Sequence, residues 1–133
     1  MSYQYYPKRP VKSFQDLEVY QKTLGLAVEI VKKIKSRSEI GQNLRATVLA
    51  IPRLIATAHS WRFGDPQRAV AALEETMLNC NLAVYYLELF RDLINKKIEP
   101  EYFEEQIKEY LRVRGKIMRL QRSWLKFMKE KNA

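Results

Sequence analysis

Apolar residues recur at every third or fourth position along most of the chain, which is the spacing of one face of an α-helix. No segment shows the strict alternation of apolar and polar residues that is typical of a half-buried strand. Four helical patterns follow one another with short polar connections between them. The sequence therefore predicts an all-α fold, an up-down-up-down antiparallel four-helix bundle over residues 13–131, preceded by a basic N-terminal arm over residues 1–12.

The first predicted helix follows Pro10 and runs from Ser13 to about Lys35. We expect Ser13 to cap it, because Asp16 stands three residues later, in the arrangement of a capping box. Its expected core-facing residues share the helical spacing and are Leu17, Tyr20, Leu24, Ala27, Val28, Val31 and Ile34.

The second predicted helix covers residues 40–61 and contains Pro52. Proline lacks a backbone N–H and clashes with the preceding turn, so a kink is expected at this position. The residues expected to face the core are Ile40, Leu44, Val48, Ile51, Ile55, Ala58 and Trp61.

The stretch "FGDP" separates the second helix from the third. Gly64 is expected to end one helix, Asp65 to cap the next and Pro66 to occupy its first position. The stripe expected to face the core consists of Val70, Leu73, Met77, Cys80, Val84, Leu87, Phe90 and Ile94.

The fourth predicted helix begins at Pro100, after the turn "NKKIEP", and continues to about Lys129. Counted at 100° per residue, its expected core face falls within an arc of roughly 100° and consists of Val113, Ile117, Leu120, Trp124, Phe127 and Met128. A neighbouring arc of roughly 140° gathers the basic residues Arg112, Lys116, Arg119, Arg122, Lys126 and Lys129.

The composition gives this protein a positive net charge. The 133 residues are 47% hydrophobic and include 24 Lys and Arg against 15 Asp and Glu, a formal net charge of +9, which favours a polyanionic partner. No long uncharged apolar stretch predicts a membrane span or a signal peptide. The single cysteine, Cys80, excludes an intrachain disulfide and suits a reducing compartment, so a cytoplasmic location is expected. No membrane partner is expected, because the apolar face of the basic helix is needed by the bundle.

The basic residues of the fourth helix have few acidic residues one turn away, which favours a track for nucleic-acid phosphates, RNA or DNA. The alternative is an ordinary solvated face, because cations near a helix C-terminus complement the macrodipole. The arm offers three further candidate phosphate ligands, interleaved with its tyrosines: Lys8, Arg9 and Lys12. Alternatively, these tyrosines only dock the arm.

Catalytic chemistry has little support in the sequence. His59 is the one histidine, Cys80 stands on an apolar stripe, and no Gly-rich phosphate loop or Glu-x-x-His pair is present. We therefore expect a protein that is not an enzyme and that holds no metal or cofactor.

Some apolar residues exceed one stripe per helix. Tyr85 and Tyr86 point about 100° apart, and the apolar face of the fourth helix is widened by Phe103, Ile107, Leu111 and Met118. A wide apolar face on a small bundle predicts self-association.

Three stretches give the chain a family resemblance that runs from Ser13 to Phe127. "SFQDLEVYQK", "IGQNLRATVLAIPRLIATA" and "RDLINKKIEPEYFEEQIKEYLRVRGKIMRLQRSWLKFM" resemble the four-helix-bundle proteins first noticed in intervening sequences of bacterial 23S ribosomal RNA genes. The opening "IGQ" of the second helix, the closing "RGKIMRLQRSWLK" and the basic balance resemble one branch, the accessory variability determinant (Avd) proteins of diversity-generating retroelements.

The resemblance implies a pentameric ring of bundles that binds nucleic acid and a reverse transcriptase and supports cDNA synthesis, without catalytic residues. The other branch implies the alternative, a structural or protein-interaction bundle whose basic face docks an acidic protein.

Overall fold

The computed structural model describes residues 12–132, and every regular element in that range is helical. A short 3-10 turn, η1 (Phe14–Asp16), precedes α1 (Glu18–Lys33) and α2 (Glu39–Trp61). The long helix α3 (Pro66–Leu89) continues into a π-helical segment, η2 (Phe90–Ile94), and α4 (Pro100–Asn132) follows. The described residues therefore form four helices and no strand, as an all-helical bundle requires.

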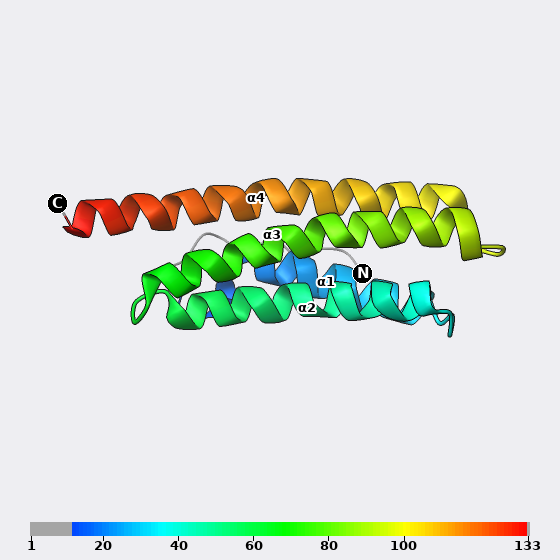
Figure 1. The fold of residues 1–133 in the computed structure, drawn as a ribbon, viewed down its shortest axis with the longest axis horizontal. Coiled ribbons are helices and arrows are strands. Elements are labelled where there is room, and N and C mark those ends of the chain that lie inside the picture. The colour runs from blue at the N-terminus through cyan, green and yellow to red at the C-terminus, as the bar shows by residue number, and fades with distance from the viewer. Residues whose placement is uncertain (1–11, 133) are drawn as a thin grey trace.

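The helices lie side by side along one long axis (Figure 1). α2 packs against α1 and α3, α3 also packs against α4, and α4 makes a smaller contact with α1. The connection between α2 and α3 lies at the opposite end of the array from the connection between α3 and α4 (Figure 1). The last turns of α4 extend past the α2–α3 connection, so they have fewer neighbours than the rest of that helix.

The predicted capping box at the N-terminus is present, but it caps a different element. The Ser13 hydroxyl accepts a hydrogen bond from Gln15 N, and the Asp16 carboxylate accepts one from Ser13 N at 3.3 Å. The turn that they close is the 3-10 turn η1, and Leu17 then adopts an extended conformation. α1 therefore begins at Glu18, five residues later than the capping pattern indicated.

Side-chain caps also fix the starts of α2 and α3. Ser38 caps α2 by accepting from Gly41 N at 3.0 Å, and Asp65 caps α3 by accepting from Arg68 N at 3.2 Å, with Pro66 at the first position as predicted. The α3–α4 turn closes on Asn95, whose side chain both accepts from Ile98 N and donates to Ile98 O. α2 continues through the buried Pro52.

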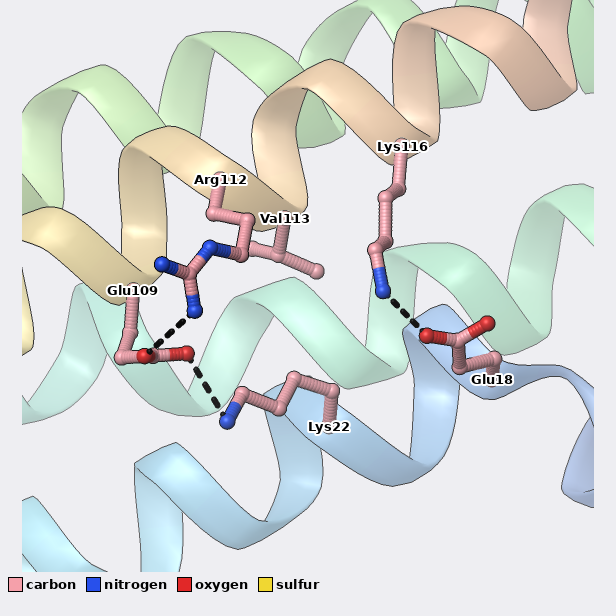
Figure 2. Close-up of a pocket in the computed structure, with 6 residues that line it drawn as sticks. All are labelled: Glu18, Lys22, Glu109, Arg112, Val113 and Lys116. Atoms are coloured by element: carbon pink, nitrogen blue, oxygen red, sulfur yellow. Dashed lines mark hydrogen bonds and ion pairs between the residues drawn. The ribbon is translucent and has the colours of Figure 1, made fainter. Parts of the chain in front are cut away.

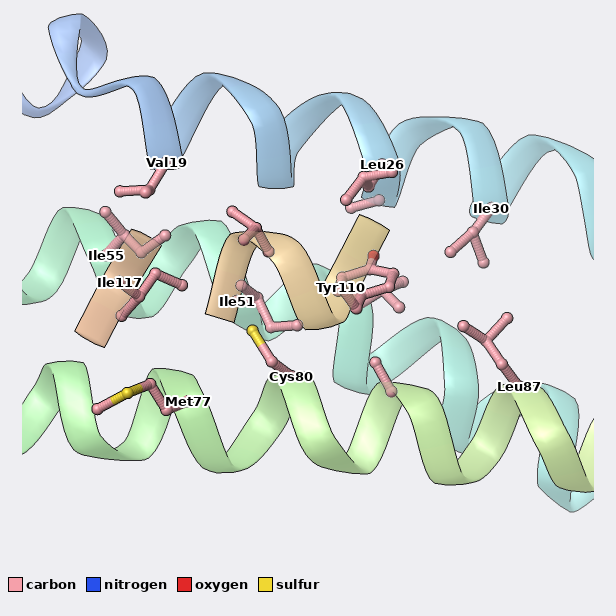
Figure 3. Close-up of a cluster of buried hydrophobic side chains, with 14 of the residues drawn as sticks. Val19, Leu26, Ile30, Ile51, Ile55, Met77, Cys80, Leu87, Tyr110 and Ile117 are labelled. Carbon is pink, nitrogen blue, oxygen red and sulfur yellow. The ribbon is translucent and has the colours of Figure 1, made fainter. Parts of the chain in front are cut away.

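Side chains from all four helices meet in one apolar core (Figure 3). Tyr110 and Phe103 of α4 are its largest fully buried members. The core residues labelled in Figure 3 are Val19, Leu26, Ile30, Ile51, Ile55, Met77, Cys80, Leu87, Tyr110 and Ile117. Phe103, which the sequence placed on spare surface, therefore belongs to the core.

The predicted core face of α1 is partly wrong. Leu24 and Val28 are exposed, whereas Val19, Leu26 and Ile30 are buried together with the correctly predicted Leu17, Ala27 and Ile34. α1 has apolar residues on two faces. The face that carries Leu26 and Ile30 packs into the core, and the face that carries Leu24 and Val28 is exposed. The exposed positions leave an apolar strip on the outside of α1.

α3 also has a second apolar stripe, on its outer side. Leu78, Leu82 and Tyr85 are exposed, and they alternate at spacings of four and three residues like the seam positions of a coiled coil. Tyr86 is half-buried, so the expected divergence of the two tyrosines is confirmed. This exposed stripe fits the predicted self-association, which nothing in a single chain tests.

Removing the hydroxyl of Tyr110 is expected not to destabilise the bundle. Burial raises the pKa of Tyr110 well above its ordinary value, and its hydroxyl has no hydrogen-bond partner among the described residues. Tyr110→Phe should therefore leave the free energy of unfolding unchanged or raise it by up to about 1 kcal/mol, since an unpaired buried hydroxyl is costly. Urea denaturation measures the free energy of unfolding. A decrease of more than about 1 kcal/mol in the variant would reveal a partner for the hydroxyl, such as an internal water.

Candidate nucleic-acid interface

The six predicted basic residues of α4 all lie on its outer side. Five of them are exposed to solvent, and Lys116 is half-exposed beside α1: Arg112, Lys116, Arg119, Arg122, Lys126 and Lys129. From Arg112 to Lys129 the row extends about 26 Å at 1.5 Å per residue. It is called the basic row below.

Two members of the basic row have acidic partners, one on α4 itself and one on α1 (Figure 2). Arg112 contacts Glu109, one turn earlier on α4, at 3.1 Å. Lys116 pairs with Glu18, which α1 brings from 98 positions away in the sequence. Lys22 of α1 also contacts Glu109, at 2.8 Å. These ion pairs connect α1 to α4 and reduce the charge that Arg112 and Lys116 offer to a ligand.

Glu109 is the shared carboxylate of this cluster. Its pKa is held below the ordinary value of 4.5 by the hydrogen bond from Lys22 and by the positive charge of Arg112, although burial opposes the shift. A carboxylate with a lowered folded-state pKa contributes stability above its unfolded pKa and loses it as the pH falls through the lower folded value. The α1–α4 contact is therefore expected to weaken in acid.

The rest of the basic row is unpaired. Arg119, Arg122, Lys126 and Lys129 form no ion pair within residues 12–132, and all four are exposed. They occupy the second half of α4, which includes the turns that project past the α2–α3 connection (Figure 1). An unpaired cation on a helix surface is free to approach a phosphate without first losing an internal partner.

The arm contributes one residue to the described structure. Lys8 and Arg9 lie outside the described residues; Lys12 is exposed, and its backbone N–H donates to Asp16 at 3.0 Å. The segment that follows it reaches the basic row, because Leu17 and Glu18 share a groove with Lys116 and Arg119. Among the described residues, no hydrogen bond or ion pair joins Lys12 itself to that row.

A second group of residues was missed by the sequence-based prediction. Trp61 and Phe127 were expected to face the core, yet 39% of Trp61 and 46% of Phe127 are exposed. Phe127 gathers with the exposed Phe63 and with Arg62 where α2 ends beside the last turns of α4. Trp61, the last residue of α2, instead contacts Arg68 of α3. The runs "WRF" and "WLKF", each mixing aromatic and basic residues, are the sequence features that could have indicated it.

Cys80 and the acidic groups offer little for catalysis. Burial raises the pKa of the Cys80 thiol to about 12, so the thiol remains protonated at neutral pH and is a poor nucleophile. Within residues 12–132, His, Cys, Asp and Glu side chains form no group of three that could hold a metal ion. In the same range, no helix is long and apolar enough to cross a bilayer.

The site is thus defined by charge, exposure and aromatic rings alone. Comparisons of the chain with protein-family models, with curated proteins and with solved structures gave no match.

Proposed function

We propose that this chain is a non-enzymatic accessory protein that binds RNA or DNA through the basic row of α4. The observation that supports this most directly is the run of four exposed cations that have no acidic partner within residues 12–132: Arg119, Arg122, Lys126 and Lys129. Such a run favours binding to successive phosphates, with little dependence on base sequence, because each neutralised phosphate releases condensed counterions.

The proposed assembly is a ring of up-down-up-down antiparallel bundles in the cytoplasm, a pentamer by the family resemblance. The exposed apolar positions support self-association, since Leu78 and Tyr85 lie on α3 and Leu24 and Val28 lie on α1. Two different apolar faces on one subunit suit head-to-tail contacts, which close into rings. Each added subunit would add another basic row for the same nucleic acid and so raise the avidity.

The proposed partner is the reverse transcriptase of a diversity-generating retroelement, whose cDNA synthesis the ring would support. This part rests on the resemblance of "IGQNLRATVLAIPRLIATA" and "RGKIMRLQRSWLK" to the Avd branch. A reverse-transcriptase gene next to the gene for this chain, and co-purification of the two products, would support it; failure to co-purify would contradict it.

A second candidate is an interaction bundle of the ribosomal-intervening type that docks an acidic protein. The observation that favours it is the exposed pair Leu111 and Leu125 beside the basic row, because apolar and basic residues together are common at protein interfaces. The Lys116–Glu18 pair is an internal example of the basic row binding a carboxylate.

Fluorescence anisotropy distinguishes the two candidates. A labelled structured RNA and a labelled DNA duplex would each be titrated with the protein from low to high salt. Tight binding that weakens steeply with salt supports the phosphate track. Absence of binding at low salt contradicts it, and the basic row should then be tested with acidic proteins.

A further inference from the structure

The end of the bundle where α2 meets the last turns of α4 presents three aromatic rings to solvent. Phe63 is 67% exposed, Phe127 46% and Trp61 39%. Phe63 and Phe127 line a cavity of about 370 Å³ together with Arg62, Met128 and Lys131. These residues form what is called the aromatic end below; Trp61 lies next to Arg62 in the sequence and is not among the residues that line the cavity. Exposed rings of this size are costly in water, so two of them at one cavity favour a ligand.

Arginines are stacked against the rings at this end of the bundle. The Arg62 guanidinium carbon lies 4.9 Å from the ring centroid of Phe63 and 5.2 Å from that of the buried Trp124. Its Nε atom is buried and has no hydrogen-bond partner among the described residues. The Arg68 guanidinium carbon lies 4.5 Å from the ring centroid of Trp61. These cation–π contacts place positive charge directly against the rings.

The charge around the aromatic end selects the kind of ligand. Lys131 lines the cavity, and Lys126 of the basic row precedes Phe127 directly on α4. The acidic group lining this cavity, Asp65, already accepts the capping hydrogen bond of α3. Arg68 forms an ion pair with Asp65 at 3.9 Å. Flat rings for stacking, with cations beside them and a phosphate track on the same helix, suit an unpaired nucleotide.

We propose that the aromatic end stacks an unpaired nucleobase, at a single-stranded end or overhang, while the basic row holds the phosphates of the adjoining strand. This inference rests on the proposed function and narrows it to a junction between paired and unpaired nucleic acid. Stacking on aromatic side chains tolerates every base because each base has a π-face, so the site would recognise strandedness rather than sequence.

The test compares two labelled probes by anisotropy at one salt concentration, a blunt DNA duplex and the same duplex with a short single-stranded extension. The extended duplex is expected to bind about tenfold more tightly, the lower end of what stacking of one base provides. Phe63→Ala with Phe127→Ala should abolish that difference and change the affinity for the blunt duplex by less than about twofold.

Further variants separate stacking from simple apolar burial. Phe63→Leu with Phe127→Leu keeps apolar surface without rings and should lose the preference, whereas Phe63→Tyr with Phe127→Tyr should retain it. Leu93→Ala is the matched control, because Leu93 is exposed in η2, the segment that follows α3 at its other end. Circular dichroism of each variant verifies that helix content is unchanged.

Each outcome has a definite meaning. Equal binding of both probes by the wild type overturns this inference and leaves the phosphate track in place. A preference that survives in the Ala or Leu variants also overturns it, as does an equal loss for both probes. If neither probe binds at low salt, the proposed function fails along with the inference.

Discussion

Reversing the charge of Arg119, Arg122 and Lys126 together is expected to lower the affinity for duplex RNA or DNA by at least about a hundredfold at 0.1 M salt. All three side chains are exposed and free of ion pairs within the described chain, so their replacement by glutamate removes no internal contact. Losing three phosphate contacts should also flatten the slope of log affinity against log salt by about 2.7. Arg112 and Lys116 are left intact because their ion pairs stabilise the α1–α4 contact.

The matched control reverses three other exposed cations, Lys32, Lys96 and Lys97, which lie at the end of α1 and in the α3–α4 turn. The net charge changes by the same amount, so a general loss of attraction would affect both variants equally. Affinity within a few-fold of the wild type is expected for the control. Equal losses in the two variants would contradict a track on α4 and indicate attraction by the whole protein.

Truncation of Phe103 is expected to have the largest effect on stability. Phe103 is 0% exposed and packs against Phe90, with ring centroids 5.9 Å apart, at the junction of α4 with the π-helical segment η2. Phe103→Ala should lower the free energy of unfolding by about 3–5 kcal/mol, through lost apolar burial and the cavity left behind. Since a domain of this size has only about 5–15 kcal/mol in total, partial unfolding at 37 °C is expected.

Leu111→Ala provides the control on the same helix, because 52% of Leu111 is exposed. Its effect on unfolding by urea should stay within about 0.5 kcal/mol. A Phe103→Ala loss as small as that of Leu111→Ala would mean that Phe103 is not part of a tight core. A large loss for Leu111→Ala would instead show that this surface is covered by another chain.

The start of α3 was predictable because it depends on neighbouring residues. Asp65 and Pro66 stand next to the helix that they begin, so local chemistry suffices to place it. The core face of α1 was not predictable in the same way. Leu24 and Leu26 are equally apolar and belong to two competing stripes, and only the packing of the other helices decides between them.

The candidate site also has features that follow from local sequence and features that depend on the packing of distant segments. The one-sided distribution of Arg119, Arg122 and Lys126 follows from helical periodicity, so the sequence sufficed to find it. The pairing of Lys116 with Glu18 depends on how α1 and α4 meet across 98 positions, which no local pattern contains. The exposure of Phe127 depends on how the last turns of α4 lie against the residues that connect α2 to α3, which no local pattern contains.

The exposed apolar stripe of α3 would link the stability of one chain to its association with other copies. Leu78, Leu82 and Tyr85 are exposed in the single chain, and in the proposed assembly a second copy that covers them would bind the folded state but not the unfolded one. Mass action would then make the melting temperature rise with protein concentration. Dilution alone would thus loosen the bundle, and the cellular level of the protein would set how much of it is folded.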